Sequence, residues 1–429
     1  MNASLKKMPL SLLLIFSLLA TFLAGCGSTS SSSNEKVTLT IQHGWNKSSA
    51  TGKLFQSLLD EFQKENPNIS IKQTITTGTD DTQVYETSYL AGEEPDIVLI
   101  NLVSKSTEWL AEGATIDVTQ YLQKWGLQDR ILAEAVQQWT NSKGQLQGFP
   151  FDGFKWPVWY NMSLLAKVGI TEAPTTIDAL LAAAQKLRAI GSGPITIGGN
   201  DWTGNKLFFQ IMESYLTNAA AQPLFENGNY CSNSDAVKGI QLFTKLRDAG
   251  VFVDSAAGLN SDQMTSLFNT QKAAIMSSGS WAISTTPDDV SKNVYLGGLP
   301  IPSDSVWTKP TAYQGYTSTG IWVSPNGAKH IDAVGKFVQF MYQQSTITKF
   351  IEQASLTPAV KTDASALQNA SPLLKQATSQ LDDRVSYVLL PDLYVPGDVL
   401  SKLQNATSQA FTSGQTVSQI CSALQAAYK

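Results

Sequence analysis

The stretch from residue 37 to residue 100 alternates between the two side-chain periods that distinguish strands from helices. Residues 37–41 alternate apolar and polar as a half-buried strand does, and 54–62 place apolar side chains on one face at helical spacing. The pattern then repeats, with alternation over 69–71, an amphipathic stretch over 85–90, and an unbroken apolar run at 97–100. Such a run, bounded by turn residues, is typical of a strand covered on both faces, as in a parallel sheet. Strand, helix, strand, helix and strand in this order predict a doubly wound α/β domain.

The same alternation begins again after residue 150. A helix that carries Leu180 and Leu187 is predicted to start at Thr175 as its N-cap, with Asp178 in its first turn. Further strands are expected at 195–197 and 272–276, and further helices over 236–249, 335–342 and 399–427. A chain of 429 residues is long enough for two such domains, so we expect two α/β lobes.

The N-terminal residues carry targeting information and are not part of this fold. Lys6 and Lys7 precede an apolar run over 10–24 that is too short and too interrupted to favour a stable membrane span. The sequence LAGC, ending at Cys26, resembles the lipobox of bacterial lipoproteins, in which the cysteine is lipidated and becomes the mature N-terminus. We therefore predict a signal peptide over 1–25 and a lipidated Cys26 with a flexible tether over 26–36. The protein would be exported and anchored to the outer face of the cytoplasmic membrane; an ordinary signal peptide with an incidental cysteine is the alternative.

Charge and motif content argue against several classes of function. With a net charge of −5, a pI near 5.2 and no block of basic residues, the chain is not expected to bind nucleic acid. His43 and His330 do not have metal-ligand spacing, and no C-x-x-C, H-E-x-x-H, G-x-S-x-G or P-loop pattern occurs. Adjacent carboxylates such as Asp288 and Asp289 suit solvated turns. We therefore expect no catalytic residues, no metal and no cofactor.

Two cysteines remain once Cys26 is assigned to the lipid. Cys231 and Cys421 are an even pair in an exported chain, where disulfides form and persist. They either form a disulfide or stay as two buried thiols. Their separation in sequence does not decide between the two.

Seven stretches, in order along the chain, carry a family resemblance. The first four are 55–67 (FQSLLDEFQKENP), 89–98 (YLAGEEPDIV), 159–187, which contains WYN, AKVGI and APTTIDALLAAAQKL, and 267–281, where Gln271 replaces the family's usual glycine. The other three are 299–302, 320–325 and 333–340. Together they resemble the extracellular solute-binding proteins of family 1, the lipid-anchored proteins that deliver sugars to ABC importers.

The resemblance implies an α/β, two-lobe periplasmic-binding-protein-like fold (type II), with the ligand cleft between lobes that are joined by a hinge. On the family pattern, lobe I comprises 37–149 plus 315–375, and lobe II comprises 150–314 plus 376–429. The resemblance further implies a monomer that is not an enzyme. Such a protein captures a mono- or oligosaccharide and delivers it to the membrane subunits of an ABC transporter.

Aromatic and polar side chains at strand ends are the candidates for ligand contact. Flat rings stack on the apolar face of a sugar, and polar groups must pair its hydroxyls when these lose water. Trp281 follows 278–280 at a predicted strand end and matches the family's stacking tryptophan. Other strand ends and the first crossing between the lobes add Trp45, Asn46, Asp81, Asn101, Asp152, Phe154, Trp156, Asp201 and Trp202. Residues 158–161, beyond Pro157, are predicted to be core.

Two alternatives to a sugar-binding protein stay open at this point. One is a binding protein for another solute, such as a polyamine, an anion or a peptide. The other is a lipid-anchored glycoside hydrolase, which needs two carboxylates at a fixed spacing across a cleft.

Overall fold

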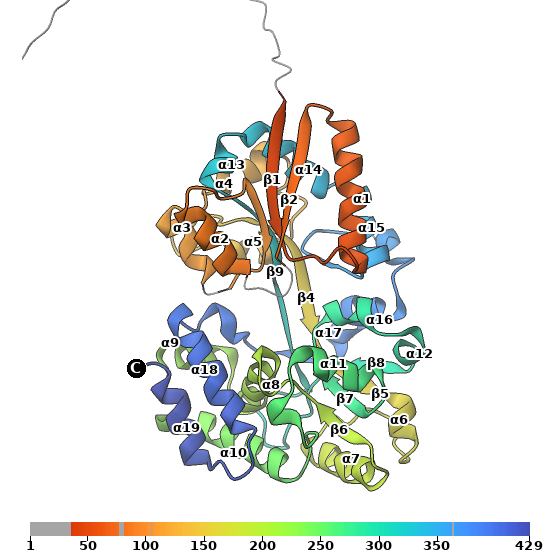
Figure 1. Ribbon diagram of the computed structural model, residues 1–429. Coiled ribbons are helices and arrows are strands. Elements are labelled where there is room, and N and C mark those ends of the chain that lie inside the picture. The colour runs from red at the N-terminus through yellow and green to blue at the C-terminus, as the bar shows by residue number, and fades with distance from the viewer. Residues whose placement is uncertain (1–35, 77–80, 104, 363) are drawn as a thin grey trace, which may run out of the picture. The chain divides into compact units, whose positions relative to one another are not determined.

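The computed structural model describes residues 36–76, 81–103, 105–362 and 364–429, which form two α/β lobes, each built around one sheet (Figure 1). The predicted signal peptide, Cys26 and residues 27–35 of the tether lie outside the described residues. None of the helices in the described part of the chain is long and apolar enough to cross a membrane. The two-lobe α/β fold that the resemblance implied is confirmed.

The lobe at the top of Figure 1 is built on a seven-stranded sheet. Its strands, in spatial order, are β10 (Thr357–Pro358), β4 (Phe149–Trp156), β9 (Thr311–Val323), β3 (Ile97–Ile100), β1 (Val37–His43) and β2 (Ile69–Ile75), with β11 (Ser386–Tyr387) also paired to β9. β1 pairs in parallel with β2 and β3, whereas β9 runs antiparallel to both β3 and β4. The strands over 37–100 are therefore parallel, as the sequence suggested, and the sheet as a whole is mixed. The long strand β9 enters from the other lobe and so runs opposite to β3.

The helices of this lobe pack around that sheet. They are α1 (Ala50–Glu65), α2 (Asp81–Leu90), α3 (Trp109–Glu112), α4 (Thr119–Lys124), α5 (Ala133–Trp139), α13 (Pro325–Ala328), α14 (Ile331–Met341) and α15 (Gln344–Ala354). In α1, the Ser49 side chain accepts a hydrogen bond from the Gly52 backbone N–H at 3.0 Å and so caps the first turn. The apolar face predicted over 54–62 is the buried face of this helix.

The lower lobe is built on a four-stranded sheet in the order β6 (Gly193–Thr196), β7 (Ala273–Ser277), β5 (Val158–Asn161) and β8 (Val294–Gly297). Its helices are α6 (Met162–Ala166), α7 (Ile177–Ala189), α8 (Trp202–Met212), α9 (Asn218–Asn227), α10 (Ser234–Asp248), α11 (Ser261–Asn269), α12 (Asp288–Ser291), α16 (Pro372–Lys375), α17 (Leu381–Arg384), α18 (Gly397–Ala410) and α19 (Val417–Ala426). Only β6 and β7 are parallel, because β5 runs antiparallel to both of its neighbours.

Two strands carry the chain between the lobes. β4 ends at Trp156, and after Pro157 the chain continues as β5 in the other sheet, where all four residues are buried as predicted. Proline has no backbone N–H, so it suits a point where the chain leaves one hydrogen-bonded ladder and enters another. β9 pairs with β4 at Tyr313 and with β3 at Val323. The two strands thus form an antiparallel ribbon that leads from one lobe to the other (Figure 1).

Three local features differ from the sequence expectation or decide between alternatives. Thr176, and not Thr175, caps α7, because its side chain accepts from the Ala179 backbone N–H at 3.3 Å. The helix expected over 399–427 is interrupted between α18 and α19, where Gly414 takes the left-handed φ of 85°. Cys231 and Cys421 form a disulfide, with Cα atoms 5.3 Å apart.

Candidate functional site

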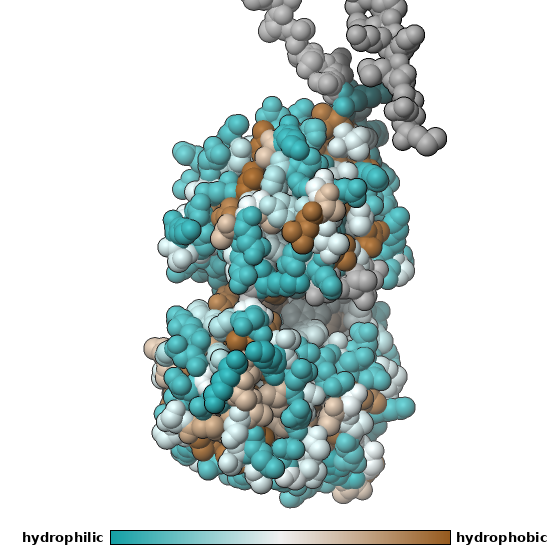
Figure 2. Space-filling model, turned by 60° about the vertical axis from the view of Figure 1, so that its left-hand side comes forward, coloured by the Kyte–Doolittle hydropathy of each residue, from teal (hydrophilic) through white to brown (hydrophobic). Residues whose placement is uncertain are grey.

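A cavity of about 570 Å³ is lined by residues of both lobes and by the strands that join them. Its volume falls within the usual range of small-molecule sites. The aromatic and charged residues that line it are Trp45, Asp152, Phe154, Trp156, Trp202, Lys206, Trp281 and Asp392. The amide and hydroxyl residues are Thr51, Asn101, Asn205, Ser280, Ser284, Thr317, Ser318, Thr319, Ser355, Thr357 and Gln404. Figure 2 shows a narrow waist between the two lobes, and the face in view is mostly hydrophilic.

Two tryptophans of the lower lobe are substantially exposed to solvent. Trp281 is 41% exposed, and it lies in the 3-10 helix that follows β7. Trp202 is 38% exposed and is the first residue of α8. Burying apolar surface of this size is favourable, so two half-open indoles that line one cavity form an apolar surface suited to a flat partner.

Two aromatic residues of β4 lie behind these tryptophans. Phe154 and Trp156 line the cavity but are almost fully covered, with Trp156 only 2% exposed. The Trp156 ring packs edge-on against Trp281 and Trp202, with centroid separations of 5.1 and 5.4 Å. Its Nε1–H donates to the Ser277 hydroxyl at 3.1 Å. Trp156 therefore supports the exposed rings more than it presents a face of its own.

Trp45 lines the cavity from the upper lobe. It follows β1, and its ring packs edge-on against Phe55 of α1 at 4.8 Å and lies 5.6 Å from Phe350 of α15. Asn101 lines the same cavity directly after β3. Both residues follow parallel neighbouring strands, β1 and β3, whose ends meet at one edge of the sheet as predicted.

Asp152 and an ion pair provide the ionisable groups of the cavity. Burial raises the pKa of the Asp152 carboxyl well above its ordinary value, and a hydrogen bond with the Gly153 backbone offsets this only in part. A carboxyl group that holds its proton more readily can donate a hydrogen bond as well as accept one. Lys206 of α8 is buried and forms an ion pair with Asp392.

Three predicted site residues do not line the cavity. Asn46 accepts hydrogen bonds from the backbone and hydroxyl of Ser48, at 2.9 and 2.8 Å. The Asp201 carboxylate caps α8 by accepting from the Thr203 backbone N–H at 2.9 Å. Asp81 is the first residue of α2. Their side chains belong to the turns and helix starts that follow the strands.

The sequence matches one family model over residues 46–346, that of the bacterial extracellular solute-binding proteins. The chain belongs to this family.

Several relatives agree with this assignment. This solute-binding protein is 41% identical to a probable secreted solute-binding lipoprotein from Streptomyces coelicolor, a match that covers 91% of this chain and 98% of that one, with a TM-score of 0.80. A chitin oligosaccharide binding protein shares the fold at 23% identity, also with a TM-score of 0.80, over 91% of this chain and 98% of its own. An uncharacterized ABC transporter extracellular-binding protein of Pyrococcus horikoshii is 25% identical over 78% of this chain and 76% of its own length.

Sequence reasoning missed several residues that line the cavity of this solute-binding protein. Asn205 and Lys206 lie three and four positions after Trp202 on α8. Helical spacing places such residues on the same face, so this signal could have found them. Asp392 and Gln404 come from the C-terminal part of the chain, where no local pattern indicated a cleft.

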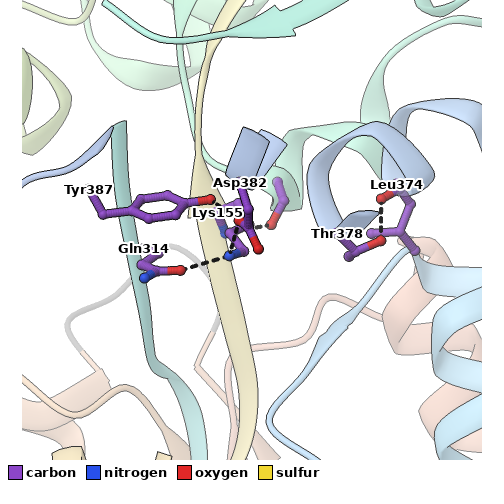
Figure 3. Close-up of polar contacts among 7 residues, drawn as sticks. Lys155, Gln314, Leu374, Thr378, Asp382 and Tyr387 are labelled. Atoms are coloured by element: carbon purple, nitrogen blue, oxygen red, sulfur yellow. Dashed lines mark hydrogen bonds and ion pairs between the residues drawn. The ribbon is translucent and has the colours of Figure 1, made fainter. Parts of the chain in front are cut away.

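Lys155 joins the segments that connect the lobes of this solute-binding protein (Figure 3). Lys155 is not among the residues that line the cavity, and its Nζ donates to Gln314 of β9 at 2.7 Å and to Asp382 of α17 at 2.8 Å. The same ammonium lies 4.6 Å from the ring centroid of Tyr387 in β11. Partial burial acts to raise the pKa of Asp382, but its hydrogen bonds with Lys155 and Tyr387 bring it below the ordinary value. One cation thus contacts three chain segments where the chain passes between the lobes.

Proposed function

We propose that this protein captures a carbohydrate, a mono- or oligosaccharide, in the cavity between its lobes and delivers it to the membrane subunits of an ABC importer. Closure of the lobes about the hinge would bury the sugar, and the transporter would recognise the closed form. The protein would act as a monomer that binds its ligand without changing it. In this proposal the lobes follow the family pattern, with 37–149 plus 315–375 in lobe I and 150–314 plus 376–429 in lobe II. The structure differs locally, because β4 stays in the upper sheet as far as Trp156 and α16 packs on the lower lobe.

One observation carries the proposal: two half-exposed tryptophans share a cavity with groups that can pair hydroxyls. Trp202 and Trp281 offer apolar ring faces, while Asp152 and Asn101 offer a carboxyl and an amide in the same cavity. A pyranose has both kinds of surface, a face of C–H groups and a rim of hydroxyls, and desolvated hydroxyls cost free energy unless they are paired.

The relatives support the same ligand class. Proteins with this fold include a chitin oligosaccharide binding protein and a maltose-bound protein of T. maritima. A probable sugar-binding periplasmic protein of Rhizobium meliloti is 27% identical to this chain over 48% of its length and 49% of the relative's length.

The proposal includes export and a lipid anchor on Cys26. The LAGC sequence at the end of the apolar leader supports it, and the Streptomyces coelicolor relative is itself called a lipoprotein. Mass spectrometry of the mature protein tests this part. A diacylated N-terminal fragment that begins at Cys26 is expected, and an unmodified N-terminus elsewhere would contradict it.

Thermal unfolding of the mature protein against a sugar panel tests the ligand class. A ligand that binds only the folded state raises the melting temperature by mass action, by an amount that grows with its concentration. At least one carbohydrate should raise it. If no sugar does so while a polyamine, anion or peptide does, the substrate class is wrong.

Replacing one exposed tryptophan tests the site. Trp281→Ala should weaken binding of the sugar found in the panel by about 1–3 kcal/mol, the loss typical of a well-packed aromatic contact. Ile190→Ala removes another exposed apolar side chain, at the end of α7 and outside the cavity, and should leave affinity unchanged. Equal affinities of the two variants would remove Trp281 from the site.

Incubation of the same sugar with the protein separates binding from hydrolysis. The sugar should be recovered intact. Turnover of a chromogenic glycoside that is abolished by Asp152→Asn would instead identify a glycoside hydrolase.

A further inference from the structure

Trp202 and Trp281 meet at an angle that limits what they can hold. Their ring centroids are 5.8 Å apart and their planes are inclined by 49°. A ring clamped between two parallel indoles needs roughly 7–8 Å between them, twice the optimal separation of non-bonded carbon atoms. The pair is too close and too inclined for such a clamp. It forms two adjoining apolar facets, and one flat ring can lie face-on to only one of them.

The Trp156 ring contacts both exposed tryptophans and helps to set the angle between them. It meets Trp281 at 84° and Trp202 at 78°, so it stands edge-on to both facets. The Nε1–H···Ser277 bond and near-complete burial hold the Trp156 ring in place. Because its backbone belongs to β4, one of the strands that join the lobes, this ring links the hinge to both facets.

Gly279 lies directly against the Trp281 ring and leaves room for it. A Cβ on this residue would lie 2.1 Å from Cζ3 and 2.2 Å from Cη2 of Trp281. The backbone of Gly279 is extended, with φ of −76° and ψ of 168°, which any residue can adopt. The absence of a side chain is therefore required by the indole that lies against it, and not by the backbone.

We propose that Gly279 and Trp156 are positioning residues that set the angle between the two exposed tryptophans, and that the angled pair makes the site selective for sugar chains of two or more units. Two successive rings, inclined to one another, can each cover one facet, whereas a single ring leaves one facet in water. This inference rests on the proposed carbohydrate function and adds the chain length and the residues that select it.

Calorimetric titration with sugar ladders tests the inference. The probes are glucose, xylose and N-acetylglucosamine, each compared with its own oligomers of two to four units. In the series that binds, the dimer should bind the wild-type protein at least about tenfold more tightly than the monomer, as expected when a second aromatic contact is filled. Gly279→Ala should reduce this dimer-to-monomer ratio severalfold, because the added methyl group displaces the Trp281 ring.

Two further variants keep the test independent of misfolding. Gly258→Ala adds a methyl group where no atom lies within 4 Å of the new Cβ, so it should leave the ratio and the melting temperature unchanged. Trp202→Ala removes one facet at a partly exposed position and should lower dimer affinity more than monomer affinity.

The outcomes separate this inference from the proposed function. A wild-type protein that binds a monomer as tightly as its oligomers overturns the inference and leaves the carbohydrate function intact. An unchanged ratio in folded Gly279→Ala removes the positioning role. Failure of every carbohydrate to bind overturns the proposed function, and the inference with it.

Discussion

Glu213 is a buried carboxyl group whose ionisation should control how stability depends on pH. It follows α8, is 0% exposed, and accepts hydrogen bonds from the Tyr313 hydroxyl at 2.9 Å and the Leu389 backbone N–H at 3.0 Å. No ion pair to it occurs among the described residues. Burial raises the pKa of Glu213 well above its ordinary value, an effect that the two hydrogen bonds only partly offset. The folded protein therefore binds this proton more tightly than the unfolded chain does.

The sign of the effect follows from this difference. Below the unfolded-state pKa of about 4.3, both states hold the proton and Glu213 causes no change with pH. Between that value and the raised pKa of the folded state, the free energy of unfolding falls as pH rises, by up to about 1.4 kcal/mol per pH unit. Above the folded-state pKa, the loss is complete and the curve becomes flat again.

Glu213→Gln should remove this dependence without leaving an unpaired group. The glutamine Oε1 can accept from the Leu389 N–H, and its Nε2 can donate to the Tyr313 hydroxyl. That hydroxyl then donates to the Lys206 carbonyl, which already lies 3.1 Å away. At pH 5 the variant should match the wild type to within about 1 kcal/mol, the net contribution of one hydrogen bond. It should become progressively more stable than the wild type as pH rises.

Equilibrium unfolding in urea, followed by circular dichroism from pH 5 to pH 8, measures this difference. Taking the difference between variant and wild type cancels the contribution of other buried groups such as Asp152. Glu65→Gln, at the exposed end of α1, is the matched control and should give a curve parallel to the wild type. A Glu213→Gln difference that does not change over this pH range would refute the reasoning.

Three further predictions concern stability. Replacing Cys231 and Cys421 by serine opens a link across a sequence separation of 190 residues and should cost about 2–5 kcal/mol of unfolding free energy; unfolding that is insensitive to dithiothreitol in the wild type would contradict this. Lys155→Met should lower the free energy of unfolding in urea by about 1 kcal/mol, because it removes the cation that joins β4 to β9 and α17. An unchanged free energy of unfolding would show that solvent screens these contacts. Gly320→Ala places a methyl group 2.0 Å from Cη2 of Trp139 and should lower stability by about 1–3 kcal/mol, whereas an unchanged melting temperature would show that the Trp139 ring can move aside.

Local patterns in the sequence predicted the elements with the clearest periodicity. The apolar spacing over 54–62 predicted the buried face of α1, and the apolar run at 97–100 predicted β3. The same reasoning placed Trp281 and Trp202 next to the ends of β7 and β6, and both line the cavity. These inferences worked because a helix or strand repeats its buried positions at a fixed period, which is visible in one short stretch of sequence.

Polar residues after strands were a less reliable guide to the cavity. Asp201 follows a strand just as Trp202 does, but its carboxylate caps α8. Asn46 likewise accepts hydrogen bonds from its own turn. The first backbone N–H groups of a helix need acceptors, so a short polar side chain at this point can serve the turn as readily as a ligand.

The sequence alone determined the alternation of elements, the family and the stretches that lead to the cleft. Tertiary structure decided that Trp156 lies behind the exposed indoles. It also placed Asp392 and Gln404 in the same cavity as Asn205 and Lys206, which are far from them in sequence. It brought Cys231 to Cys421 as well. It also decided that the sheets are mixed, because β9 returns from the other lobe. Periodicity records which side of an element is buried, whereas the identity of the neighbour that buries it depends on contacts between distant parts of the chain.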